Sequence, residues 1–195
     1  MDRRREVLGF NLRRAVQDGD FGEVKRLVGE VGAPVDAADS SGMQALHCAI
    51  AYTGHLEMVK FLIAAGAQID DATQENGWQA VHYAAWNGHL AVVKYLIGEK
   101  GAKMEAADSE GRQVLHVAAY GGQLGVVEYL VRERGADVFA KTRDGSTPID
   151  LADDVPDVRE FLQEWMEAEE TRACIRNVLA RQRKLGALRP RNPGL

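Results

Sequence analysis

A period of about 34 residues constrains this chain more than any other feature of its sequence. A glycine recurs at intervals of 35, 34 and 34 residues, at Gly42, Gly77, Gly111 and Gly145. A histidine stands five residues after each of the first three glycines, at His47, His82 and His116, and Asp150 takes the fourth position. A weaker copy precedes the three full units and the divergent copy around Gly145 ends the series, which makes five units. Repeats of this length indicate supersecondary units stacked in a row.

Each unit carries the apolar pattern of two short helices. The first helix presents a narrow face of small residues, such as Ala84 and Ala85. The second presents a wider face at a spacing of 3.6 residues, for example Leu90, Val93 and Ile97. A glycine between the two helices is a turn signal. Because one helical pair cannot bury both faces, the units must stack side by side and share one elongated core.

The motifs in these units resemble the ankyrin repeat, in segments such as "DSSGMQALHCA", "NGWQAVHYAAWNGH" and "DGSTPID". The resemblance covers about residues 11 to 163. It implies an all-α solenoid of antiparallel helix pairs with short β-hairpin fingers. The expected ankyrin-repeat domain spans 1–163, and a charged C-terminal amphipathic helix and tail follow. Its units are an N-terminal cap 1–38, repeats 39–72, 73–107 and 108–141, and a C-terminal cap 142–163; the helix and tail span 164–195.

The units depart from the family pattern in two ways. Glutamine replaces the helix-capping threonine at Gln44, Gln79 and Gln113, and we expect the longer amides to reach neighbouring histidines or finger carbonyls. Single residues are also added. The addition at Ile50-Ala51 is expected to bulge the first helix of the second unit, whereas those in "GEKGA" and "RERGA" are expected to lengthen loops.

The repeat argues against a catalytic or metal site. Equivalent residues of neighbouring units lie roughly 10 Å apart, which is too far for one metal ion to take ligands from the equivalent histidines. We therefore expect His47, His82 and His116 to be structural and to tie the finger to the first helix. The sequence contains no phosphate-binding glycine loop and no nucleophile elbow. No enzymatic activity, no cofactor and no metal is expected.

The resemblance places exposed, variable positions next to the finger glycine and before the glycine between the helices, along the concave face. Tyr52, Trp86 and Tyr120 would form an aromatic row there. Exposed aromatic residues and arginine are the types that dominate binding energies at interfaces. The alternative is that these rings only cover neighbouring helices. The predicted partner-binding residues are Met43, Tyr52, Trp78, Trp86, Arg112, Tyr120, Asp153 and Asp154.

Charge is polarised at the C-terminal end. Residues 150–170 contain nine acids and one base, whereas residues 171–195 contain seven bases and no acid. An apolar pattern through both segments predicts a helix. This helix either lies back on the repeats or serves as a second docking element for an acidic partner, a coiled coil or a groove. The residues of that second element would be Trp165, Ile175, Arg176, Leu179, Arg181, Arg183 and Lys184.

These features predict a non-catalytic adaptor that binds a protein partner. The alternatives are a structural subunit of a larger assembly, such as a cytoskeletal one, and, more remotely, a metal-dependent enzyme. The net charge of −5 argues against a dedicated nucleic-acid binder. No run of 18 apolar residues is present and no apolar segment follows the N-terminal arginines, so we expect no membrane insertion and a cytoplasmic location, with the nucleus as the alternative.

Overall fold

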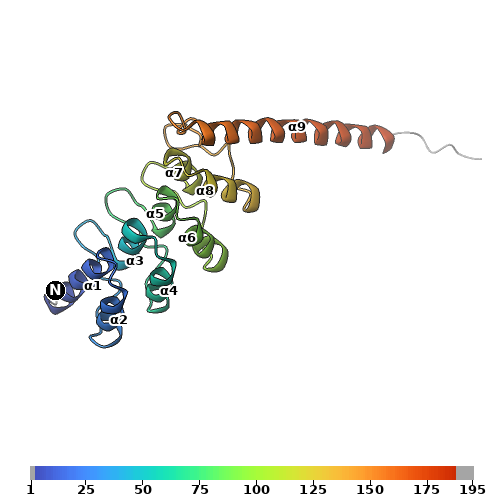
Figure 1. Ribbon diagram of the computed structural model, residues 1–195. Coiled ribbons are helices and arrows are strands. Elements are labelled where there is room, and N and C mark those ends of the chain that lie inside the picture. The colour runs from blue at the N-terminus through green and yellow to red at the C-terminus, as the bar shows by residue number, and fades with distance from the viewer. Residues whose placement is uncertain (1–2, 188–195) are drawn as a thin grey trace, which may run out of the picture.

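The computed structural model describes the backbone of residues 3–187 and the side chains of residues 3–180. Helices fall into pairs that stack side by side, and a long last helix projects from the end of the stack (Figure 1). The expected all-α solenoid is confirmed. In chain order the elements are α1 (Arg3–Gln17), α2 (Phe21–Gly29), α3 (Ala45–Cys48), the π-helical turn η1 (Ala49–Thr53), α4 (Leu56–Ala64), α5 (Ala80–Trp86), α6 (Leu90–Lys94), the π-helical turn η2 (Tyr95–Glu99), α7 (Val114–Tyr120), α8 (Leu124–Glu128), the π-helical turn η3 (Tyr129–Glu133) and α9 (Pro156–Ala187).

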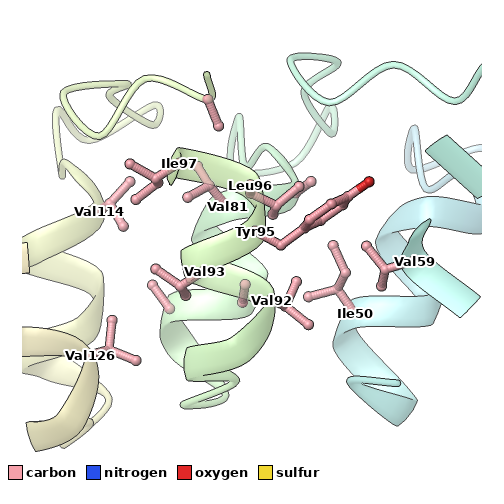
Figure 2. Close-up of a cluster of buried hydrophobic side chains, with 14 of the residues drawn as sticks. Ile50, Val59, Val81, Val92, Val93, Tyr95, Leu96, Ile97, Val114 and Val126 are labelled. Carbon is pink, nitrogen blue, oxygen red and sulfur yellow. The ribbon is translucent and has the colours of Figure 1, made fainter. Parts of the chain in front are cut away.

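The core runs between the two layers of helices along the whole stack. Small residues of the first helices are fully buried, among them Ala84 in α5 and Ala118 in α7, and they allow these helices to pack closely. Larger residues of the second helices fill the space between units. In Figure 2, Val92 points toward Ile50 of the preceding unit, whereas Ile97 points toward Val114 of the following one. Each unit therefore buries its apolar surface mainly against its neighbours.

Three buried histidines link consecutive units. In the first helix of each full unit the ring Nδ1 accepts a hydrogen bond, 3.2 Å long, from the backbone N–H of the glutamine three residues earlier. Because Nδ1 is an acceptor, the ring proton is on Nε2, which donates to a backbone carbonyl 24 residues later at 3.0 Å. The pairs are His47 with Asp71, His82 with Ala106 and His116 with Ala140. The expected structural role is confirmed, and the carbonyl belongs to the loop that leads into the next unit.

The glutamines that precede these histidines use their amides as expected in one case and differently in another. The Gln79 amide donates to the carbonyl of Asp70 at 2.9 Å, at the base of its own finger. The Gln44 amide instead donates to the carboxylate of Asp71, at 2.7 Å. In both units the longer side chain therefore fastens the helix start to the loop between units two and three.

The added residues are absorbed inside helices. The bulge expected in the first helix of the second unit is confirmed as η1, in which the Gly54 N–H reaches back five residues to the Ala49 carbonyl. The longer loops expected from "GEKGA" and "RERGA" are wrong, because the extra residue widens the end of the second helix into η2 and η3. A π-helical turn keeps three consecutive side chains, such as Tyr95, Leu96 and Ile97, in the core.

The fingers are tight turns, and the expected β-hairpin ladders are wrong for the described residues. An isolated bridge joins Ala107 and Gln113, and no strand is formed. Adjacent fingers are connected instead by one backbone hydrogen bond each, such as that from Gln74 N–H to the Ser41 carbonyl at 2.8 Å. Gly42 has a φ of +83°, and a Cβ there would lie 2.9 Å from the Gln74 nitrogen, so glycine is required for this close approach.

The last helix leaves the stack after three turns. Val158, Phe161 and Leu162 are buried against the repeats, but Ile175 and Leu179 are 53% and 48% exposed. The alternative in which this helix lies back on the repeats is therefore wrong for the described side chains beyond residue 170. Among the residues that the structure describes, no helix has the length and apolar character needed to cross a membrane.

The three buried histidines predict that the fold loses stability in mild acid. Burial lowers the pKa of His47, His82 and His116. In the unfolded chain a histidine has a pKa of about 6.5, so the stability they contribute is complete above that pH and is lost as the pH falls from there toward the lowered values. We expect the free energy of unfolding, measured with urea, to be lower at pH 5.5 than at pH 7.5, by up to about 1.4 kcal/mol for each histidine. His89, whose pKa burial also lowers, acts in the same direction.

The control is the variant H82Q, which removes one of the titrating groups. Its free energy of unfolding should depend less steeply on pH than that of the wild type over the same range. An unfolding free energy that is constant between pH 7.5 and pH 5.5 would contradict this assignment.

Candidate functional site

The concave face carries an aromatic row at equivalent positions of three units. Tyr52 lies in η1, and Trp86 and Tyr120 are the last residues of α5 and α7. Each ring therefore lies near the C-terminal end of the first helix of its unit. The three side chains are exposed by 63%, 36% and 53%, so the core does not take them up. The expectation that these rings are accessible is confirmed.

The rings gather more tightly than the spacing of the units suggests. Trp86 and Tyr120 have ring centroids 5.3 Å apart, with an angle of 35° between their planes. Trp86 also lies 5.6 Å from Trp78. Adjacent helices are roughly 10 Å apart, so the side chains lean toward one another to make these contacts. Part of the apolar surface of the row is thus already covered within the chain.

The prediction that Trp78 is an accessible binding residue is wrong. Its side chain is only 9% exposed. The indole Nε1 donates a hydrogen bond to Asp108 of the next finger, at 3.0 Å, and the ring of Tyr83 packs edge-on at 5.1 Å. Trp78 is therefore mainly a structural link between two fingers: the next finger covers most of its ring, and a small part still lines the groove.

Arg112 is held by the same link and is not a free anchor. Its Nε donates to the Asp108 carboxylate at 2.7 Å and its Nη1 lies 3.0 Å from Glu110. Burial alone would raise the pKa of the Asp108 carboxyl, but the hydrogen bonds from Arg112, Glu110 and Trp78 together hold that pKa below its usual value. Only 21% of the Arg112 side chain is exposed. The carboxylate of Asp108 was not among the predicted site residues, although its position before the finger glycine is repeated in the sequence.

Two hollows open along the concave face beside these residues. The first, of about 430 Å³, lies between units two and three and is lined by Met43, Tyr52, Trp78, Trp86 and others. The second, of about 470 Å³, lies between units four and five and is lined by Tyr120, Arg112, Arg143 and Asp144 among others. Six of the predicted residues thus line these two depressions: Met43, Tyr52, Trp78, Trp86, Arg112 and Tyr120.

Sequence reasoning missed Tyr83, which also lines the first hollow. It is half-buried and stands three residues before Trp86, on the same side of α5. That spacing was the available signal. Its hydroxyl lies 3.3 Å from the Thr73 Oγ1. Burial raises the pKa of Tyr83, and the nearby Glu75 carboxylate acts in the same direction.

Two acidic residues that were predicted to contact a partner lie in a turn and not in a helix. Asp153 and Asp154 are exposed in the turn that precedes α9. The Asp153 carboxylate accepts a hydrogen bond from Arg159, so one of the two acids is paired. Thr147 starts this unit with a bond from its hydroxyl to Asp150 at 2.6 Å, which replaces the histidine arrangement of the other units. Of the two predicted residues, Asp153 is therefore paired within the chain.

The second predicted docking element is only partly exposed. Trp165 is half-buried, with the Phe161 ring 6.1 Å away and the Arg172 guanidinium 5.3 Å from its centroid. Ile175 and Leu179 are exposed on the free part of α9. Arg176 is exposed as well and lies 3.9 Å from Glu169. The side chains of Arg181, Arg183 and Lys184 lie outside the described residues.

The described side chains include residue types that can bind metals or act as nucleophiles. No group of three or more histidine, cysteine, aspartate or glutamate residues among them is arranged to hold a metal ion. Burial raises the pKa of the Cys48 thiol to about 11, so it stays protonated at neutral pH and is a poor nucleophile.

Comparison with known proteins agrees with this architecture. A family model described as ankyrin repeats matches residues 12–108 and 70–142. These two stretches overlap and together span units one to four. A search of curated proteins found no match to this chain.

The different burial of two rings predicts different effects on stability. Trp78→Ala removes a buried ring and leaves Asp108 without one of its donors, so we expect a loss of about 3–5 kcal/mol in the free energy of unfolding. Tyr52→Ala removes an exposed ring, and its loss should stay within about 0.5 kcal/mol. Urea unfolding followed by circular dichroism measures both. Equal losses in the two variants would show that the assigned roles are incorrect.

Proposed function

Because this chain belongs to the ankyrin-repeat family, whose repeats are modules for protein–protein interaction, we propose that it is a non-catalytic adaptor that binds a protein partner along its concave face. The observation that carries the proposal is the accessible aromatic row of Tyr52, Trp86 and Tyr120. The core is complete without these rings, since Ala49, Ala85 and Ala119 of the same helices are fully buried. The fold itself names no partner.

The physical case for docking is the energy that such rings release when a partner covers them. Aromatic side chains near the centre of an interface are typical hot spots, and truncating one costs about 2 kcal/mol or more of binding energy. The row also lies beside two hollows that can take side chains of a partner. Within the proposal, Met43 and Tyr52 contribute at one end, Tyr120 in the middle and Asp154 at the acidic end.

A second docking element on α9 is part of the proposal. Ile175, Val178 and Leu179 form an exposed apolar cluster on one side of the helix. The same part of the chain, residues 171–187, contains five bases and no acid. This combination favours an acidic partner surface with an apolar groove. Apolar contact and opposite charge would then act together beyond the end of the stack.

The alternative function is that of a structural subunit in a larger assembly. It rests on the same two surfaces, both of which would then be buried permanently. Native size-exclusion chromatography of a cell extract separates the two ideas, because a stable subunit elutes only in a large complex.

The adaptor is proposed to act in the cytoplasm.

Removing the aromatic row should abolish partner binding without unfolding the protein. We expect the triple variant Y52A/W86A/Y120A to capture none of the partner that the wild type retains in an affinity pull-down, while its thermal midpoint stays close to the wild-type value. Phe139→Ala is the matched control, since Phe139 is a 42% exposed aromatic residue that lines neither hollow. Retained capture by the triple variant would refute the concave docking face.

The α9 element predicts a salt-dependent contribution to binding. A chain that ends at residue 170 should bind the same partner more weakly, and its affinity should change less with salt than that of the full chain, because five helical bases are gone. The variant I175S/L179S keeps those bases and removes apolar contact, so its affinity should fall while the salt dependence remains. Titration calorimetry at low and high salt measures both. Unchanged affinity in both variants would leave α9 without a binding role.

A further inference from the structure

The hollow between units two and three has an unusual chemical lining. Four of its ten lining residues are aromatic, namely Tyr52, Trp78, Tyr83 and Trp86. They come from two successive units and from both a finger and the helices behind it. The volume of about 430 Å³ lies within the roughly 300–1,000 Å³ range of small-ligand pockets. The hollow is therefore large enough for one side chain or small cation.

Three of the four aromatic walls are already in contact with one another in the free chain. Trp78 lies 5.1 Å from Tyr83 with an angle of 72° between the rings, and 5.6 Å from Trp86 with an angle of 54°. The three rings thus meet at steep angles, as walls of a box do. The indole of Trp78 is held through Nε1 by Asp108. Preorganised walls lose little conformational freedom when a ligand binds.

The hollow offers negative charge and no positive charge. Glu75 is the one charged residue among the residues that line it. No ion pair of Glu75 is formed with another described residue. Its carboxylate acts on the hydroxyl of Tyr83, where it helps to raise the pKa.

Five of the nine other aromatic rings in the described chain already have a cation beside them. On the helices outside the groove, a lysine or arginine lies 4.2–5.7 Å from a ring centroid in six places. Those rings are Phe21, Tyr95, Tyr129, Phe161 and Trp165. No such pair involves any of the four rings of the hollow within the described residues. A cation is thus the complementary group that this site lacks.

We propose that the hollow of Tyr52, Trp78, Tyr83 and Trp86 binds an alkylated ammonium group, such as a methylated lysine side chain of the partner. Aromatic faces attract a cation through their quadrupole, and N-methyl groups pack against the rings. Glu75 supplies the compensating charge. A primary ammonium is strongly hydrated, and aromatic walls replace few of its hydrogen bonds with water, so the methylated form binds better. This inference rests on the proposed docking face and names a ligand class for part of it.

The test uses choline and its neutral carbon isostere, 3,3-dimethylbutan-1-ol, which have nearly the same shape. The full chain carries W165F, so that Trp78 and Trp86 alone report binding by fluorescence. Choline is expected to change the emission in a saturable way, and the neutral alcohol should bind at least about tenfold more weakly. Absence of saturation with choline, or equal binding of the two compounds, would overturn the proposal.

Variants in the same background locate the site. Tyr52→Ala and Glu75→Gln change exposed side chains, and each is expected to weaken choline binding by about three- to tenfold. Phe139→Ala is the matched control, because Phe139 is a 42% exposed ring that does not line this hollow. It should leave choline binding within about twofold. If Y52A and E75Q bind choline as well as the parent does, the cation is not held in this hollow and the proposal fails.

The result is separable from the fate of the docking face. If the triple variant Y52A/W86A/Y120A loses partner capture and the W165F parent chain does not bind choline, the cation site is refuted and the docking face stands. If the W165F parent chain binds choline and the triple variant still captures the partner in full, the docking face is refuted and the cation site stands.

Discussion

The hydrogen bonds of three buried histidines are the interactions on which the stack depends. Each ring accepts from the start of its own helix and donates to the loop that leads into the following unit. A stack of small units has no sheet or large globular core to hold its register, so a polar link repeated at three of the four junctions helps to fix how one unit sits on the next. The link works only with a neutral ring whose proton is on Nε2. Burial favours that form, and it makes histidine at this position a feature of folding and not of chemistry.

The groove follows from the same arrangement. Because the histidines hold the fingers against the first helices, the ends of those helices open onto one concave surface. The side chains on that surface differ in their exposure to solvent. Tyr52, Trp86 and Tyr120 remain accessible, whereas Trp78 and Arg112 are taken up by contacts with Asp108. A finger residue lies beside the next finger and can be covered by it, while the end of a helix faces the open groove. The rigid finger contacts then become walls around the accessible rings.

The repeat also explains how the chain tolerates irregularity. One extra residue in a helix of ordinary geometry would rotate every later side chain by about 100° out of the core. Three units instead form a π-helical turn, which takes up the residue and keeps the following side chains buried. At the C-terminal end the last unit has no full first helix. Its second helix continues past the stack, and Ile175 and Leu179 on the projecting part are exposed.

The sequence by itself determined the number of units, the helix pairs, the structural histidines and the accessible aromatic row, since these follow from spacing along the chain. Residues related by a fixed period occupy equivalent surroundings, so their roles can be inferred from one another. Tertiary structure alone decided the burial of Trp78, the pairing of Arg112, the inclusion of Tyr83 in the hollow and the free course of α9. The physical reason is that these outcomes depend on what lies across from a side chain, and a periodic pattern fixes the slot of a residue but not the neighbour that fills the space beside it.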